Sequence, residues 1–197
     1  LSYIWHHQTL QSLFVFAVVT MLLGQSYQQL LPAYALGVFN VGSEGQGVMQ
    51  TVVGVGALIG SLTMAYISRN PNRARLQAYT GTALGLALAM FGICAAFQQF
   101  LLALVALFLV GLTLDFNATI NQTLIMLNTD QALYGRVMSV YMMTFALSGF
   151  SASASGYLMD NIGGAVTMLS QGILLAVFVV LMATLNPGYR TLRNSIS

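Results

Sequence analysis

Six long apolar runs, separated by short polar stretches, dominate this chain of 197 residues. The runs cover, approximately, residues 11–34, 47–68, 76–96, 100–126, 137–159 and 165–185. Each has about the 20 apolar residues that an α-helix needs to cross the hydrocarbon core of a bilayer. Charged residues make up 5% of the chain, against about 25% in an ordinary soluble domain. The sequence therefore predicts an all-α integral membrane protein with six transmembrane helices.

The basic residues all fall on one side of this predicted topology. They are six arginines, in the second loop, the fourth loop and the C-terminal tail: Arg69, Arg73, Arg75, Arg136, Arg190 and Arg193. An even number of crossings separates these segments, whereas the opposite loops hold Glu44 and Asp160 and no base. Because arginine is retained in the cytoplasm during insertion, we expect both termini to be cytoplasmic.

A weak internal repeat relates the first three runs to the last three. In register, Val48, Met49, Ala57, Leu58, Gly60 and Ala65 match Val137, Met138, Ala146, Leu147, Gly149 and Ala154. The two triplets start on opposite sides of the membrane, which is the arrangement of inverted repeats in secondary transporters. The alternative is a chance match, which apolar helices produce easily. The repeat predicts a fold of two inverted three-helix units.

Polar residues interrupt the fourth run on two sides of the predicted helix. Asp115 lies near its middle, where insertion scales assign such a residue a cost of about 2.5 to 3.5 kcal/mol. Helical spacing puts Thr119 and Gln122 on the same face. The opposite face carries Thr113, Asn117 and Asn121. We therefore expect one face of this helix to line a cavity, with Asp115 as a proton carrier or a counter-charge for a cationic substrate; the alternative is a neutral acid that braces the bundle.

Amides and hydroxyls mark the first and fifth runs. We expect Gln25, Gln28 and Gln29 to bind substrate, because amides donate and accept hydrogen bonds without a charge. The alternative is that they bond a neighbouring helix or meet the headgroup region. The fifth run carries a hydroxyl stripe of Tyr141, Thr144, Ser148, Ser151 and Ser155. The stripe predicts either close helix packing or a hydrophilic cavity wall, in which Tyr141, Thr144 and Ser148 are candidate substrate-binding residues.

Close packing is also indicated by small residues elsewhere in the chain. Gly56 and Gly60 form a GxxxG pattern in the second run, and Gly81 and Gly85 form another in the third. Such patterns let the backbones of two membrane helices approach each other.

The sequence argues against enzymes and nucleic-acid binders. No nucleophile and base stand at helical spacing, and one cysteine with two adjacent histidines is too little for a zinc centre. A net charge of +2 is too small to indicate a nucleic-acid partner. We therefore expect no catalytic residues, no metal and no cofactor.

Three segments resemble transporters of the major facilitator superfamily. The loop at residues 128–139, N-T-D-Q-A-L-Y-G-R-V-M-S, resembles the family's P-D-E-x-R-G-R-V-M-S segment between helices 10 and 11, although Thr129 and Tyr134 depart from it. The loop at 69–75 resembles the second copy of the family's G-x-x-x-D-R-x-G-R-R motif. The segment Y-Q-Q-L-L-P at 27–32 is similar to helix 7 of the drug and siderophore exporter branch.

This resemblance implies a function and a set of partners. The whole chain, residues 1–197, would be the C-terminal six-helix half of a transporter in a bacterial plasma (inner) membrane, lacking its N-terminal half. The implied activity is proton-coupled efflux of small amphiphilic solutes by alternating access. The partners would be membrane lipid, a small-molecule substrate and the missing half. By the family pattern, the first, second, fourth and fifth runs would line the cavity, and the gating loops would use Arg69, Arg73, Arg75, Asp130, Gly135 and Arg136.

A second function remains open at this point. The alternative to a transporter half is a self-standing six-helix channel or a membrane assembly subunit that acts as an oligomer. An intramembrane enzyme is a more remote alternative.

Overall fold

The computed structural model describes residues 7–67 and 73–185, and in this part of the chain it contains helices and no strand. The elements are α2 (Gln8–Gly24), α3 (Tyr27–Ala33), a π-helix (Tyr34–Val38), α4 (Gly42–Ile67), α5 (Arg73–Ala96), α6 (Phe100–Leu127), a 3₁₀ turn (Gln131–Leu133), α7 (Tyr134–Ile162) and α8 (Gly164–Leu185). Six segments are long and apolar enough to cross a membrane, the first of them spanning Gln8–Val38. The predicted all-α, six-span class is confirmed.

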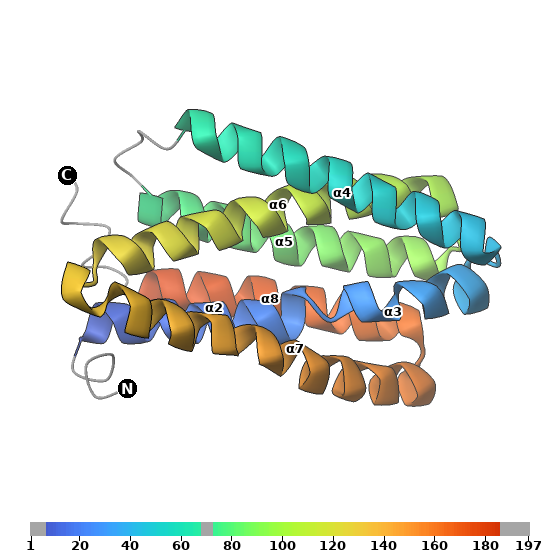
Figure 1. Ribbon diagram of the computed structural model, residues 1–197. Coiled ribbons are helices and arrows are strands. Elements are labelled where there is room, and N and C mark those ends of the chain that lie inside the picture. Colours follow the sequence, from blue (N-terminus) through green and yellow to red (C-terminus); the bar gives the residue numbers. More distant parts are fainter. Residues whose placement is uncertain (1–6, 68–72, 186–197) are drawn as a thin grey trace.

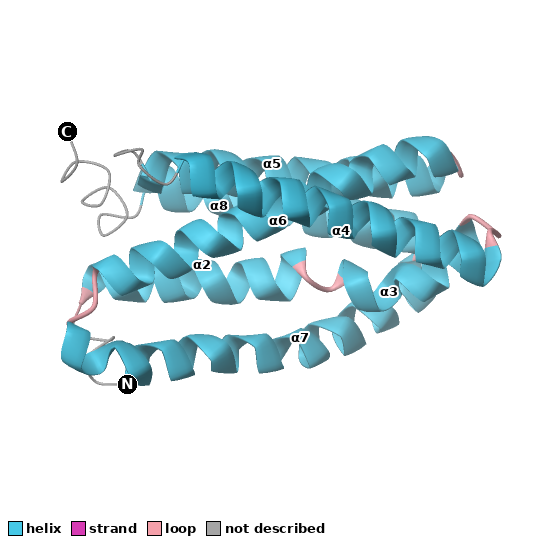
Figure 2. Cartoon of the chain, turned by 45° about the horizontal axis from the view of Figure 1, so that its top comes forward, coloured by secondary structure: helices cyan, strands magenta, loops and turns pink. Residues whose placement is uncertain are grey.

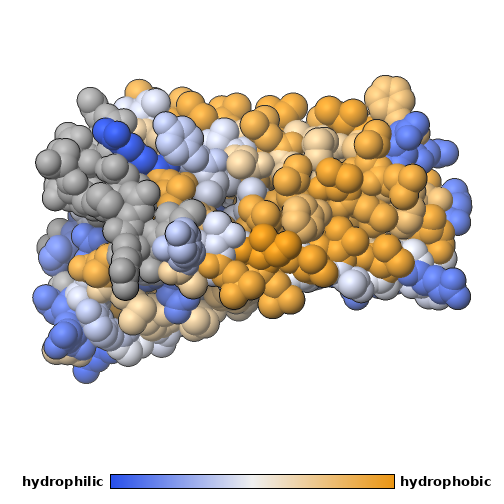
Figure 3. All heavy atoms as spheres, turned by 90° about the horizontal axis from the view of Figure 1, so that it is seen from above, coloured by the Kyte–Doolittle hydropathy of each residue, from blue (hydrophilic) through white to orange (hydrophobic). Residues whose placement is uncertain are grey.

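The helices lie side by side along one long axis, with the connections at its two ends (Figure 1). The start of α2 and the end of α8 lie at the same end, together with the end of α4, the start of α5 and the loop that follows α6. Arg75 and Arg136 belong to this end, whereas Glu44 and Asp160 belong to the other. Figure 3 shows the matching pattern on one face, where apolar residues cover the middle and hydrophilic residues gather at the ends.

The helix pairs follow the pattern of an inverted repeat. The most extensive packing joins α5 to α8 and α4 to α6, and α6 also packs against α5. The first span, through α2, packs against α7 and α8. Exchanging the first span with α6, α4 with α7 and α5 with α8 maps the pair of α4 and α6 onto that of α2 and α7, and the pair of α5 and α6 onto that of α2 and α8. The pair of α5 and α8 maps onto itself.

Glycines bring the tightest pairs into backbone contact. A Cβ atom at Gly56 or Gly60 of α4 would collide with the carbonyl oxygen of Phe108 or Leu112 in α6. Between α5 and α8, a Cβ atom at Gly85 would lie 2.7 Å from the carbonyl oxygen of Gly172. Only glycine allows such close approach, which gives the van der Waals contact that holds membrane helices together.

The first span is not the continuous helix that the apolar run at 11–34 predicts. It is interrupted at Gln25 and Ser26, between α2 and α3, as the loop between these helices in Figure 2 shows. Beyond the break, Tyr34 donates a hydrogen bond of 2.6 Å to the carbonyl oxygen of Gly164 and packs edge-on against Phe91. The outer part of the span is therefore fixed to α5 and to the start of α8.

The glycine contacts predict different effects at two neighbouring positions of α4. We expect Gly56→Ala to lower the free energy of unfolding by about 1 to 3 kcal/mol, because the added methyl group forces α4 away from α6. Gly54→Ala is the matched control, since a Cβ atom there meets no atom within 4 Å. Thermal unfolding in mild detergent measures both variants, and equal stabilities would contradict the packing described here.

Candidate functional site

A cavity of about 200 Å³ lies between the first span, α4, α6 and α7. Its walls are formed by Ala17, Thr20, Met21, Gln25, Tyr27, Gln28, Val53, Ala57, Gly111, Leu114, Asp115, Asn117, Ala118, Asn121, Tyr141 and Phe145. These residues come from the first, second, fourth and fifth spans, and none of them comes from α5 or α8. The four lining spans agree with the four that the family resemblance implies.

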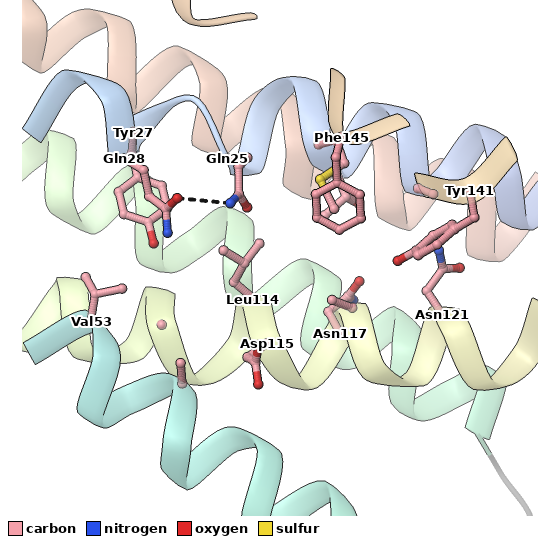
Figure 4. A pocket seen from close by; sticks show the side chains of 16 residues that line it. Gln25, Tyr27, Gln28, Val53, Leu114, Asp115, Asn117, Asn121, Tyr141 and Phe145 are labelled. Atoms are coloured by element: carbon pink, nitrogen blue, oxygen red, sulfur yellow. Dashed lines mark hydrogen bonds between the residues drawn. The ribbon is translucent and has the colours of Figure 1, made fainter. Parts of the chain in front are cut away.

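The glutamines of the first span do not all face this cavity. Gln25 and Gln28 line it, and the amide nitrogen of Gln25 donates a hydrogen bond of 3.0 Å to the amide oxygen of Gln28 (Figure 4). Gln29 is exposed and is not among the lining residues. Because the helix restarts at Tyr27, the hydrogen bond between Gln25 and Gln28 crosses the break.

The break leaves carbonyl groups of α2 without their helical donors, among them those of Leu22 and Leu23. The amide groups of Ser26 and Tyr27 do not bond the carbonyl oxygens of Leu22 and Leu23 in the usual helical manner. Instead, the hydroxyl of Ser151 in α7 donates to the carbonyl oxygen of Leu22. The hydroxyl of Ser26 lies 3.3 Å from the carbonyl oxygen of Leu23. Side chains therefore supply partners that water cannot supply in a bilayer.

A buried hydrogen-bond network connects the break to α7 and α8. The Ser26 hydroxyl also lies 3.0 Å from the side-chain oxygen of Gln171. The amide nitrogen of Gln171 in turn donates a hydrogen bond of 2.6 Å to the hydroxyl of Ser155. All three side chains are buried. The hydroxyl stripe of α7 thus braces the broken span at Ser151 and Ser155.

The remaining hydroxyls of the stripe behave differently. Tyr141 lines the cavity and points toward Asn121 (Figure 4). Thr144 and Ser148 donate to the carbonyl oxygens of Tyr141 and Phe145 in their own helix and are not among the lining residues.

One polar face of α6 packs against α5. The side-chain nitrogen of Gln77 donates a hydrogen bond of 2.8 Å to the side-chain oxygen of Asn121. The side-chain nitrogen of Asn117 lies 3.2 Å from both the carbonyl oxygen of Gln77 and the hydroxyl of Thr80. Asn117 and Asn121 nevertheless reach the cavity wall. Asn117 and Asn121 therefore have two roles: they form hydrogen bonds with α5, and they line the cavity.

Asp115 is a residue of the cavity wall and lies within a transmembrane span. Its side chain is partly buried, and no hydrogen bond or ion pair to the carboxyl group is found within residues 7–67 and 73–185. The hydroxyl of Thr119 bonds the backbone carbonyl of Asp115, not its carboxyl group. Thr119 and Gln122 are partly buried and do not appear in the cavity wall.

The predicted gating residues whose side chains the structure describes lie outside the cavity wall. Arg69 falls outside the described residues, as does the side chain of Arg73. The other four members of the group are exposed near the end of the bundle that holds the start of α2: Arg75, Asp130, Gly135 and Arg136.

Sequence reasoning missed several polar residues of the site. Thr20 and Tyr27 line the cavity but were not expected there. They are seven positions apart, close to two helical turns, which was the signal available in the sequence. Gln77 and Gln171 are each the single amide side chain of α5 or α8, and an amide within a membrane-spanning helix favours a buried hydrogen bond.

Comparison with known proteins gives one match. The family model described as Major Facilitator Superfamily matches residues 1–153. No curated protein and no solved structure matches the chain.

The network at the break predicts a loss of stability when one member is removed. We expect Ser155→Ala to lower the free energy of unfolding by about 0.5 to 2 kcal/mol, because the amide of Gln171 loses its partner. Ser153→Ala is the control, since Ser153 is exposed and bonds only the carbonyl of Gly149 in its own helix. Denaturation in detergent compares the two, and a stable Ser155→Ala variant would show that the network does not brace the span.

Proposed function

Because this chain belongs to the major facilitator superfamily, it is a secondary-transporter chain, and we propose that its cavity carries small amphiphilic solutes out of the cell, coupled to protons. The superfamily is one of transporters, not enzymes. The observation that carries the proposal is the cavity itself, whose wall combines four spans and a partly buried carboxyl group. Export rests on the resemblance of residues 27–32 to the drug and siderophore exporter branch.

The cavity wall supports an amphiphilic solute. Its polar groups are Thr20, Gln25, Tyr27, Gln28, Asp115, Asn117, Asn121 and Tyr141. Between them lie apolar side chains such as Met21, Leu114 and Phe145. A sugar needs a dense set of hydrogen-bond partners, whereas a mostly apolar molecule with a few polar groups matches separated partners on an apolar wall.

The exposure of α4 and α7 supports a second six-helix half. These two helices border the cavity and are the least buried of the six spans. We propose that the missing half covers this side and that rocking of the two halves exposes the cavity alternately to each side of the membrane. The loops with Arg75, Asp130 and Arg136 would then close the cytoplasmic side.

Asp115 is the proposed proton carrier. An isolated charge within a span is costly, so the carboxyl group gains from binding a proton or a cationic solute. The described residues give it no ion-pair partner. Competition between a proton and a cationic solute for one carboxyl group would couple solute export to proton uptake.

If Asp115 carries the proton, replacing its carboxyl group should uncouple dye export from the proton gradient. We expect Asp115→Asn to abolish proton-gradient-driven export of the cationic dye ethidium and to remove its dependence on external pH, because asparagine neither titrates nor carries charge. Fluorescence of cells that express the complete protein, loaded with dye and energised at several pH values, measures the rate.

The matched control is Asp160→Asn, at the end of α7 and outside the cavity wall. It should export dye at the wild-type rate. Unchanged export and unchanged pH dependence in Asp115→Asn would eliminate the proton-carrier role.

Two adjacent glutamines provide a second test of the site. We expect Gln28→Ala to raise the KM for dye export by about threefold to tenfold, because it removes a polar partner from the cavity wall. Gln29→Ala should leave the KM unchanged, since Gln29 lies outside that wall. Export rates measured over a range of dye concentrations give the KM of each variant. A larger increase in KM for Gln29→Ala than for Gln28→Ala would show that the dye does not bind at this cavity wall.

A further inference from the structure

Two side-chain hydroxyls in the cavity wall are buried without a hydrogen-bond partner. Thr20 is 7% exposed and Tyr27 is 0% exposed. Within residues 7–67 and 73–185 neither hydroxyl has a partner at hydrogen-bonding geometry, and both residues line the cavity. Buried hydroxyls are nearly always bonded, because an unsatisfied one loses the hydrogen bonds that water gave it. This pair therefore calls for an explanation.

The threonine is unusual within its own chain. In a helix, a threonine hydroxyl commonly bonds a carbonyl oxygen of the preceding turn. Eleven threonines here do so: Thr51, Thr63, Thr80, Thr82, Thr113, Thr119, Thr123, Thr129, Thr144, Thr167 and Thr184. Thr20 does not, although it lies in the regular part of α2.

The hydroxyl of Tyr27 can be compared with that of Tyr34, seven residues later in the same span. Tyr27 and Tyr34 both belong to the first span and are both fully buried. The hydroxyl of Tyr34 donates to the carbonyl oxygen of Gly164, which is a structural contact. The hydroxyl of Tyr27 lies beside the side-chain amide of Gln28 at the cavity (Figure 4).

The break in the first span places the two hydroxyls on the same cavity. Thr20 lies in α2 before the break, and Tyr27 is the first residue of α3 after it. The network of Ser26, Gln171 and Ser155 holds the break in place on another side. Both hydroxyls are therefore held in position before any solute enters, which lowers the entropic cost of binding.

We propose that the hydroxyls of Thr20 and Tyr27 donate hydrogen bonds to oxygen acceptors, such as a carbonyl or ester group, on the transported amphiphile. The inference rests on the proposed function of the cavity and narrows its substrate class to oxygen-bearing amphiphiles. A phenol is a stronger donor than acceptor, and the wall already offers acceptors at Asp115 and Gln28. An oxygen atom of the solute would thus be the hydrogen-bond acceptor that the protein does not provide for these two hydroxyls.

The first experiment measures stability without solute. Thr20→Val and Tyr27→Phe remove only hydroxyls that have no partner, so the thermal midpoint of the complete protein in detergent should stay the same or rise by about 2 °C. Tyr34→Phe is the matched control and should lower the midpoint by about 2 to 4 °C, because it breaks the bond to Gly164. A fall in both cavity variants equal to that of Tyr34→Phe would show that the hydroxyls have structural partners, and would overturn the proposal.

The second experiment measures binding of two matched cationic dyes. Tetramethylrhodamine ethyl ester and tetramethylrosamine share one aromatic cation, and only the first carries an ester group. We expect Thr20→Val and Tyr27→Phe each to weaken binding of the ester dye by about threefold to tenfold in fluorescence anisotropy, and to leave the rosamine unchanged. Thr113→Val, whose hydroxyl bonds its own helix, should change neither.

The outcomes separate this inference from the function on which it rests. If both dyes bind and the variants weaken them equally, or not at all, water alone satisfies the hydroxyls and the inference fails while the solute cavity stands. If neither dye binds the wild-type protein, the proposed function for amphiphilic cations fails and the inference fails with it.

Discussion

A bilayer interior offers no water to bond a free backbone group, and the shape of this protein depends on how it meets that constraint. A helix break at Gln25 and Ser26 would be costly in lipid. Here the carbonyl oxygen of Leu22 accepts a hydrogen bond from Ser151, and the carbonyl oxygen of Leu23 shares the single hydroxyl proton of Ser26 with the side-chain oxygen of Gln171. A second layer, through Gln171, ties the break to α7 and α8. Discontinuous spans are known to form solute sites in transporters, and in this chain the break contributes to the cavity wall.

The contacts between the two inverted units differ in kind. The helices α4 and α6 meet through glycines at backbone distance, and α5 meets α8 in the same way. The equivalent pair of α2 and α7 packs less extensively, and its contact includes the hydrogen bond from the Ser151 hydroxyl to the carbonyl oxygen of Leu22. Gly149 and Gly156 of α7 have open space beside them. Tight apolar packing thus provides a rigid scaffold, and the looser, polar pairing leaves room for a cavity.

Part of the candidate site could be predicted from the residues alone. Gln25, Gln28, Asp115 and Tyr141 stand out as polar groups within apolar runs, and all of them line the cavity. The same reasoning also selected residues that do not line it: Gln29, Thr119, Gln122, Thr144 and Ser148. Helical periodicity identifies a face, but it does not say how far along that face a neighbouring helix closes the space. A hydroxyl that bonds its own backbone, as at Thr144, cannot be told in advance from one that is free.

The sequence by itself determined the six spans, the placement of Arg75 and Arg136 at one end and the all-α class, because the energy of burying charge in lipid acts locally on each segment. It also carried the family relationship over residues 1–153. The tertiary structure alone decided where the first span breaks, which amides bond each other and which hydroxyls are left unbonded. Those outcomes depend on partners far apart in the chain, such as Ser26 with Gln171 and Gln77 with Asn121. Hydrogen bonds between helices form only after packing has set the distances, so no local pattern contains them.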